Sequence, residues 1–255
     1  MYDAKNFRLD DNVALITGAG AGIGRAIALN FAQAGAAIMV SDYNADAAAT
    51  VAAEISKSGG RAASVACDVT KEDDLVAAVA STVSQFGKLT LLISNAGGGG
   101  PKPFDMPMAD FRRAFDLNVF SLFRLAQLAA PEMEKAGGGA MLAITSMAGE
   151  NENSRMASYG ASKAATNHLI RNIAFDLGPK GIRVNGVAPG ATRTAALQSV
   201  LNEEIEKTML MHTPIHRLGE LEDIANAALY LCSPAAAWVS GQILTVSGGG
   251  TQELS

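Results

Sequence analysis

Short apolar segments alternate with longer amphipathic segments along the chain. Five of the apolar segments are continuous rather than alternating, which is typical of parallel strands covered on both faces. We predict strands over residues 13–17, 36–41, 62–66, 89–94, 140–145, 183–187 and 243–246. We predict helices over residues 23–34, 45–58, 72–86, 111–135, 158–177 and 223–232. Because strands and helices alternate, the pattern favours a parallel sheet built from βαβ units.

Two architectures of this length contain such units, the (β/α)8 barrel and the doubly wound open sheet. Seven predicted strands, rather than eight, and two connections longer than the others favour the open sheet. We therefore predict a single Rossmann-type domain over residues 1–255, with about seven parallel strands and helices on both faces. Residues 1–7 form an N-terminal extension to it.

The composition argues against several classes of protein. Hydrophobic residues make up 49% of the 255 residues and charged residues 18%, so we expect a folded chain. The net charge of −5 argues against a nucleic-acid partner. The chain contains no apolar run of about 18 residues, and no apolar core follows Met1. We therefore expect neither a membrane span nor a signal peptide, and we expect a cytoplasmic location.

The few cysteines and histidines do not predict a metal site. Cys67 and Cys232 lie far apart and form no CxxC pair, so neither a thiolate zinc site nor a disulfide framework is expected. His212 and His216 have helical spacing, but Pro214 interrupts the helix that would align them.

A glycine-rich turn follows the first predicted strand and opens the first predicted helix. Glycines let the backbone turn tightly and approach a pyrophosphate, and the start of the helix offers free N–H groups to the anion. A glycine cluster alone is often only a turn, but here both flanking elements are present. We predict a dinucleotide site that includes Gly18, Gly22, Ile23 and Gly24.

An acidic residue at the end of the second strand indicates which dinucleotide binds. Asp42 lies 18 residues after Gly24, where a carboxylate accepts hydrogen bonds from a ribose 2′,3′-diol and repels a 2′-phosphate. No Arg or Lys occupies residues 19–23 or 43. We predict NAD as the cofactor, with Tyr43 beside it, against the alternative that Asp42 is a solvated loop acid.

Polar residues also follow the third and fourth strands. Asp68 is placed to meet the adenine amino group, with Val69 next to it, and Asn95 lies where an adenosine ribose is expected. Turn chemistry is the alternative explanation, because Asp and Asn favour loops in any protein.

Tyr159 and Lys163 are the candidates for proton transfer. Their spacing of four puts both side chains on one face of a helix, and Ser146 ends the fifth strand at the same edge of the sheet. A free tyrosine has a pKa of about 10. An ammonium group about 4–5 Å away supplies roughly 3–4 kcal/mol at an effective dielectric of 20, which favours the phenolate. We predict that Tyr159 acts as a base on an alcohol whose oxygen Ser146 holds.

Alone, this Tyr–Lys spacing is more often two surface side chains. Together with the glycine turn and Ser146, however, it resembles the short-chain dehydrogenase/reductase family over about residues 8–250. The matching motifs are TGxxxGxG, NAG, Ser-(x12)-Tyr-(x3)-Lys and Pro189-Gly190-(x3)-Thr194.

The family resemblance implies further roles. Asn118 completes a catalytic tetrad and holds a water that passes protons from Lys163. Lys163 also binds the nicotinamide ribose hydroxyls, and Thr194 contacts the carboxamide. Thr192 belongs to the same cofactor loop, although the family more often has an apolar residue there. The resemblance also implies a homotetramer, packed through the Gly- and Ala-rich surfaces of helices 111–135 and 158–177.

Within the family, residues 95–113 and 238–250 are most similar to bacterial NAD-dependent members that oxidise the 7α-hydroxyl of bile acids to a 7-ketone. A steroid or bile-acid-like substrate is therefore expected at Gly99, Ser146, Asn151 and Tyr159. Glycines 97–100 are expected to leave room for its rings. Residues 194–212 are either a mobile lid over an apolar substrate or an ordinary packing helix.

Two other functions remain open. One is a reductase of the same family that acts on a 3-oxoacyl thioester or a sugar alcohol; such enzymes often use NADPH, which Asp42 and Ala21 disfavour. The other is a non-catalytic Rossmann protein that senses nucleotides. Such proteins typically lack the Tyr or the Lys, and both are present here.

Overall fold

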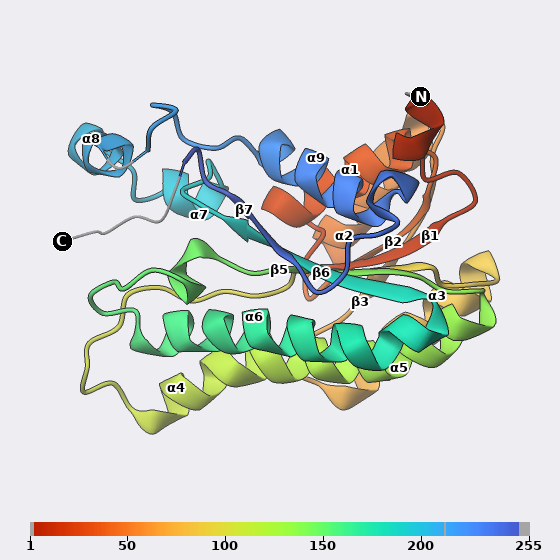
Figure 1. The fold of residues 1–255 in the computed structure, drawn as a ribbon, viewed down its shortest axis with the longest axis horizontal. Helices are drawn as coiled ribbons and strands as arrows, with labels where there is room; N and C mark the ends of the chain where they lie inside the picture. Colours follow the sequence, from red (N-terminus) through yellow and green to blue (C-terminus); the bar gives the residue numbers. More distant parts are fainter. Residues whose placement is uncertain (1–2, 212, 250–255) are drawn as a thin grey trace.

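The computed structural model describes residues 3–211 and 213–249, and it contains one seven-stranded parallel sheet. The strand order is β3-β2-β1-β4-β5-β6-β7, which confirms the predicted doubly wound fold (Figure 1). The order reverses direction between β1 and β4, so the connections leave a crevice at the carboxyl ends of the strands there. The strands are β1 Val13–Thr17, β2 Ala37–Asp42, β3 Arg61–Ala66, β4 Leu91–Ser94, β5 Gly139–Ile144, β6 Ile182–Pro189 and β7 Ile243–Val246.

Helices cover both faces of the sheet (Figure 1). One layer contains α1 Gly22–Gln33, α2 Ala45–Lys57 and α9 Leu221–Cys232. The other contains α3 Glu72–Phe86, α4 Met108–Phe115, α5 Ser121–Lys135 and α6 Ala157–Leu177. Short 3-10 turns lie at η1 Ala4–Phe7, η3 Met147–Gly149, η4 Gly178–Lys180 and η5 Pro234–Ala236.

The two-sided cover explains why the central strands are continuously apolar. In β1, Ala14 and Ile16 pack in the core of the α1 layer, whereas Leu15 packs in the core of the α5 layer. All five residues of β1 are buried, because alternate side chains reach opposite cores. The edge strand β3 is partly exposed, although Ala62 packs against one core and Ala63 and Val65 against the other.

The predicted helix over residues 111–135 is wrong in one respect. The helical run starts at Met108, and a π turn, η2 Asp116–Phe120, separates α4 from α5. A π turn inserts an extra residue, so the side chains after it point in a new direction. Here it buries Asn118 to 4% exposure, and its carbonyl oxygen accepts a hydrogen bond of 3.1 Å from the Thr166 hydroxyl on α6.

Residues 194–212 do not form one helix. They contain two short helices, α7 Ala195–Gln198 and α8 Glu203–Met211, beyond the carboxyl edge of the sheet (Figure 1). Residue 212 lies outside the described residues. Neither helix contains a buried residue, so this segment packs weakly on the body of the protein.

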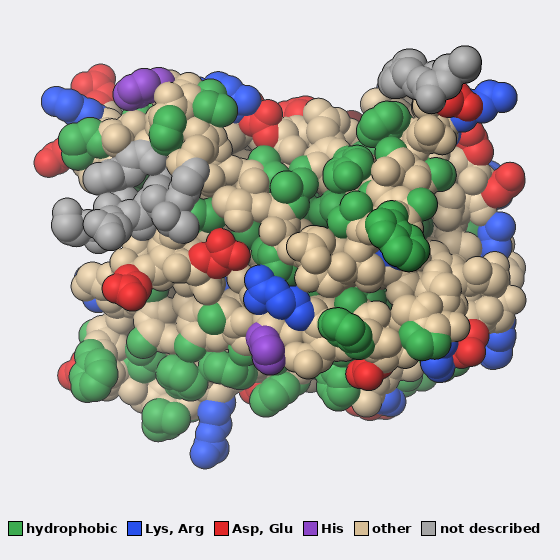
Figure 2. Space-filling view, in the orientation of Figure 1, with side chains coloured by type: hydrophobic (Ala, Val, Ile, Leu, Met, Phe, Trp, Pro, Cys, Tyr) green, Lys and Arg blue, Asp and Glu red, His purple; other side chains and the backbone are tan. Residues whose placement is uncertain are grey.

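Hydrophobic side chains are exposed over the α4–α6 layer (Figure 2). Phe120, Phe123 and Phe175 are 59%, 42% and 85% exposed, although an isolated chain gains by burying aromatic rings.

A half-buried arginine on β6 binds carbonyl oxygens at the end of α9. The Arg183 guanidinium on β6 donates hydrogen bonds to the carbonyl oxygens of Leu231 (2.7 Å), Ser233 (3.3 Å) and Val239 (3.3 Å). Burial lowers its pKa. These carbonyls lie at or beyond the end of the helix, where intrahelical donors are lacking.

We expect Arg183→Met to destabilise the protein, because three partly buried carbonyl oxygens lose a charged donor. Lost hydrogen bonds to charged groups cost about 1.5–3 kcal/mol, which lowers Tm by about 4–10 °C in a domain of this size. Calorimetry measures the shift. Arg124→Met, which removes an exposed ion pair with Glu72, is the matched control and should change Tm little. Equal shifts in the two variants would contradict the capping role.

Candidate active site

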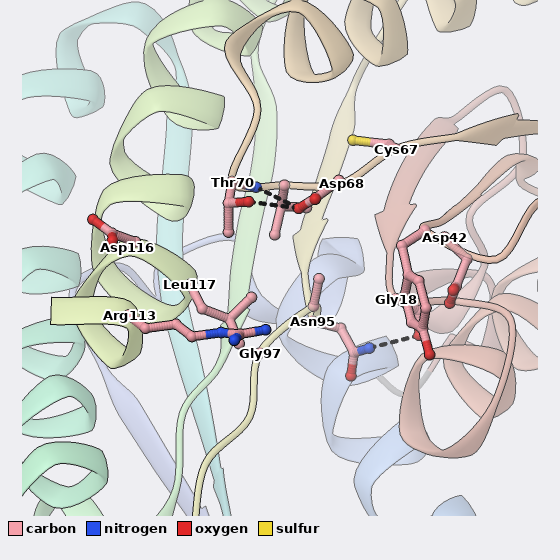
Figure 3. A pocket seen from close by; sticks show the side chains of 13 residues that line it. Gly18, Asp42, Cys67, Asp68, Thr70, Asn95, Gly97, Arg113, Asp116 and Leu117 are labelled. Atoms are coloured by element: carbon pink, nitrogen blue, oxygen red, sulfur yellow. Dashed lines mark hydrogen bonds between the residues drawn. The ribbon is translucent and has the colours of Figure 1, made fainter. Parts of the chain in front are cut away.

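Two cavities adjoin at the carboxyl edge of the sheet. The first, about 600 Å³, lies beside β1, β2 and β4 (Figure 3). The second, about 390 Å³, lies beside β5 and β6. Asn95 and Gly97 line both, so the cavities are two parts of one groove.

The glycine turn is built to leave an anion site open. Helix α1 has no side-chain cap at its N-terminus, and Gly22 has φ +55° in open space, where a Cβ would meet no atom within 4 Å. At Gly24 a Cβ would lie 2.5 Å from Asn95 Nδ2. Because the free helix N–H groups and their positive dipole end meet no acidic cap, these residues fit a pyrophosphate.

Asn95 supports the turn rather than only facing a ligand. Its Nδ2 donates hydrogen bonds to the carbonyl oxygens of Thr17 (3.0 Å) and Gly18 (2.9 Å) (Figure 3). The amide thus fixes the loop that carries the first glycines. This second role was not predicted from the sequence.

Asp42 and Asp68, the two acidic residues predicted for the cofactor site, both line the first cavity, together with Asp116, which was not predicted. Asp42 is 8% exposed, and its carboxylate accepts hydrogen bonds from the backbone N–H groups of Gly20 (2.9 Å) and Asn44 (3.0 Å). Asp68 accepts from the backbone N–H (3.0 Å) and hydroxyl (2.7 Å) of Thr70, which hold its pKa below the usual value. Carboxylates fixed in this way suit a diol and an amino group.

Most of the predicted cofactor residues line one of the two cavities, whereas Gly22 and Gly24 line neither. The first is lined by Gly18, Asp42, Tyr43, Asp68, Val69 and Asn95. The second is lined by Ile23, Asn95, Tyr159, Lys163, Thr192 and Thr194. Thr194 also caps α7, accepting a 3.2 Å hydrogen bond from Leu197 N, and Thr192 donates 3.1 Å to Gly190 O.

Ser146, Tyr159 and Lys163 meet in the second cavity. Ser146 follows β5, and its hydroxyl oxygen accepts a 3.1 Å hydrogen bond from Ala148 N. Lys163 is 5% exposed, and its Nζ donates 2.8 Å to the Ile144 carbonyl oxygen. The same Nζ lies 5.8 Å from the centroid of the Tyr159 ring. The three side chains therefore share one cavity.

The pKa of Tyr159 differs from the sequence-based expectation. Burial raises this pKa, and a hydrogen bond with Ser146 opposes the rise only in part. Burial also lowers the pKa of Lys163 to about 8. Desolvation penalises phenolate and ammonium alike, whereas the sequence-based argument counted only their attraction. Burial within the chain alone thus shifts both groups toward their neutral forms.

Asn118 is committed to a network that sequence reasoning missed. Its Oδ1 accepts from Gly98 N (3.0 Å), and its Nδ2 donates to Gly98 O (2.9 Å) and to Ser162 Oγ (3.0 Å). The fully buried Ser162 hydroxyl in turn donates 2.7 Å to the Tyr159 carbonyl oxygen. These hydrogen bonds thereby join the π turn to α6, the helix that carries Tyr159 and Lys163. The only sequence signal for Ser162 was its place between Tyr159 and Lys163.

Two of glycines 97–100 make room for protein rather than for substrate. A Cβ at Gly97 would lie 2.8 Å from Asn118 Oδ1 and 3.3 Å from Lys163 Nζ. A Cβ at Gly99, where φ is +149°, would lie 2.9 Å from Tyr159 Cγ. At Gly100, by contrast, a Cβ would meet no atom within 4 Å. The missing side chains at Gly97 and Gly99 therefore leave space for Asn118, Lys163 and Tyr159, which the sequence-based expectation did not include.

Asn151 has an unsatisfied polar atom. Its Oδ1 is buried without a hydrogen-bond partner, in the loop between η3 and α6. A buried acceptor without a donor is costly, so a ligand that donates a hydrogen bond there would be favoured.

Among residues 3–211 and 213–249, no group of three or more His, Cys, Asp or Glu side chains is close enough to hold a metal ion. His212 lies outside the described part of the chain. No helix within the described part is long and apolar enough to cross a membrane.

We expect Gly99→Ala to lower kcat, because the new methyl group displaces the Tyr159 ring. Misplacing a reacting group by about 1 Å can cost about 10²-fold in rate. Steady-state kinetics measure kcat, and NADH fluorescence measures cofactor affinity, which should not change. Gly100→Ala, at the open neighbouring position, is the matched control and should keep the wild-type kcat. Similar kcat values for the two variants would show that the missing side chain at Gly99 is not needed to position the Tyr159 ring.

We expect the buried Lys163 to make stability rise with pH. Between its folded pKa of about 8 and the ordinary lysine pKa of 10.5, the unfolded chain binds more protons than the folded chain. The free energy of unfolding therefore increases with pH in this window, at up to about 1.4 kcal/mol per pH unit, and the full cost of about 3 kcal/mol is present below pH 8.

Urea denaturation between pH 7 and 9.5 tests this expectation. The wild type should gain stability with pH relative to Lys163→Met, which lacks the titrating group. The exposed Lys57→Met should follow the wild type. If the free energy of unfolding changed with pH in the same way in the wild type and in Lys163→Met, Lys163 would not cause the pH dependence.

Comparison with known proteins agrees with this geometry. Residues 18–251 match the family model described as enoyl-(acyl carrier protein) reductase. The chain is 65% identical to 7α-hydroxysteroid dehydrogenase of Escherichia coli K12 over 255 residues, all of both chains. It is 34% identical to the 7α-hydroxysteroid dehydrogenase of Bacteroides fragilis over 246 residues, 95% of each chain.

A solved structure is similar over the whole chain. It is a 7α-hydroxysteroid dehydrogenase complexed with NADH and 7-oxo glycochenodeoxycholic acid, with a TM-score of 0.97, 65% identity and 100% coverage of both chains. The glycine turn, the paired cavities and the Ser–Tyr–Lys pocket thus occur in a chain that resembles such enzymes from end to end. The protein belongs to the short-chain dehydrogenase/reductase family.

Proposed function

We propose that this protein is an NAD-dependent dehydrogenase that oxidises the 7α-hydroxyl of bile acids to a 7-ketone. The observation that carries the proposal is the convergence of Ser146, Tyr159 and Lys163 in a cavity that adjoins the one holding Asp42. The full-length similarity to enzymes of that name supports the substrate.

In this function the cofactor occupies both cavities. Asp42 binds the adenosine ribose diol, Asp68 the adenine amino group, and the N-terminus of α1 the pyrophosphate. Lys163 binds the nicotinamide ribose, and Thr194 the carboxamide. Bound NAD supplies the acceptor for the hydride that leaves the substrate carbon.

The residues of the second cavity handle the proton. Ser146 donates a hydrogen bond to the alcohol oxygen and holds it near Tyr159 Oη. Tyr159, as the phenolate that the Lys163 charge stabilises, accepts the hydroxyl proton and becomes neutral. Because burial alone raises the pKa of Tyr159, the positive charge in the groove is essential to this step. Asn118 holds a water that carries the proton onward from Lys163.

Apolar side chains suit a steroid. Leu197 and Met209, from α7 and α8, line the second cavity together with its polar groups. Residues 194–212 serve as a lid that closes over the ring system. Gly99 and the unsatisfied Oδ1 of Asn151 contact the substrate, and Asn151 accepts a hydrogen bond from a second hydroxyl.

We further propose a homotetramer. The exposed Phe120, Phe123 and Phe175 supply aromatic surface on the α4–α6 layer that packing between subunits would cover. Cytoplasmic location stays a prediction from the sequence.

A panel of alcohols tests the substrate. We expect NAD reduction with cholate and chenodeoxycholate, which carry a 7α-hydroxyl, and none above background with deoxycholate, which lacks it. Tyr159→Phe should lower the rate by at least about 10²–10⁴-fold, because the general base is lost. Absorbance at the NADH band measures each rate.

Four results would contradict the proposal. Turnover of deoxycholate equal to that of cholate would show that the 7-hydroxyl is not the group oxidised. Full activity of Tyr159→Phe would show that Tyr159 is not the general base. Preference for NADP over NAD in the same assay would show that Asp42 does not select NAD, and it would favour one of the related reductases. Binding of NAD without turnover of any alcohol would favour the nucleotide sensor.

A further inference from the structure

Arg113 contributes a guanidinium to the first cavity, and the sequence motifs do not account for it. It lies on α4, one helical turn before Leu117, and both residues line the cavity. Figure 3 shows its side chain extending from α4 into the cavity, on the side away from Asp42. Arg113 is the one Lys or Arg among the described residues that line this cavity.

The side chain has no partner that explains its position. Within residues 3–211 and 213–249, the Arg113 guanidinium takes part in no hydrogen bond or ion pair. Lys71, by contrast, pairs with Asp68 at 3.7 Å. Asp42 and Asp68 also have their own donors. The guanidinium is therefore available to a ligand in the cavity.

The positions of the carboxylates indicate which part of a dinucleotide lies near Arg113. Asp42 marks the ribose, and the pyrophosphate belongs at the N-terminus of α1, beyond Gly18. The base then occupies the far part of the cavity, between Val69 and Leu117, where Thr70 and Asp116 also contribute to the lining. A planar guanidinium beside a planar base stacks on it, which a lysine ammonium cannot do in the same way.

We propose that Arg113 stacks on the adenine ring and closes the adenosine cavity toward solvent. This inference rests on the proposed NAD cofactor, and it adds a binding residue outside the glycine turn and the acidic residues. Because Arg113 extends from α4, it also links base binding to the helical run that carries Asn118.

The test measures the binding of cofactor fragments, independently of catalysis. Dissociation constants of NADH, AMP, adenosine and nicotinamide mononucleotide are obtained by titration and by displacement of NADH fluorescence. We expect Arg113→Ala to weaken NADH, AMP and adenosine by a common factor of about three to ten. Nicotinamide mononucleotide, which lacks adenine, should bind as before.

Two variants serve as controls. Arg112→Ala makes the same change in net charge at the neighbouring exposed residue, which does not line the cavity, and should keep wild-type affinities. Arg113→Lys keeps the charge without the planar group and should behave like Arg113→Ala.

Other outcomes would overturn the inference. Weakening confined to phosphate-bearing ligands, with normal affinities in Arg113→Lys, would make Arg113 a phosphate contact. Equal affinities in Arg113→Ala and Arg112→Ala would leave it no binding role, while the proposed function stands. A wild-type protein that binds none of the adenine ligands would remove both this inference and the proposed cofactor.

Discussion

The hydrogen bond from Lys163 Nζ to the Ile144 carbonyl oxygen is the contact on which the site depends. It ties α6 to the end of β5, and it gives a buried ammonium its hydrogen-bond partner within the core. Burying an ammonium is unfavourable, so the side chain is held where a fixed acceptor compensates it. Tyr159, one helical turn earlier, is thereby set beside Ser146.

The loops around this contact are shaped to fit the catalytic helix. Gly97 and Gly99 lie against Lys163 and Tyr159, where no side chain would fit. The Asn118 side chain bonds to both the N–H and the carbonyl oxygen of Gly98. Its hydrogen bond to Ser162 joins Asn118 to α6. The loop that carries Gly97–Gly99, the π turn η2 and helix α6 thus depend on one another. A change in any of them is expected to shift the Tyr159 side chain.

Much of this arrangement can be predicted from sequence, because it rests on local patterns. Continuous apolar runs identify buried parallel strands, and spacing identifies Tyr159 with Lys163. The remainder depends on contacts between distant segments. The π turn forms where Asn118 meets Thr166 and Ser162, and the role of Gly99 follows from a ring 60 residues later. The pKa of Tyr159 depends on its burial, which no spacing reveals.

Because the strand order reverses between β1 and β4, different stretches of the chain line the two cavities of the groove. Residues 18–70 supply most of the adenosine cavity, and residues 144–209 most of the reaction cavity, while the segment from Asn95 to Leu117 serves both. Two stretches of one polypeptide are therefore open to separate variation. An evolving lineage can exchange its alcohol by altering the second stretch and retain the same coenzyme, so substrate range and coenzyme choice need not change together.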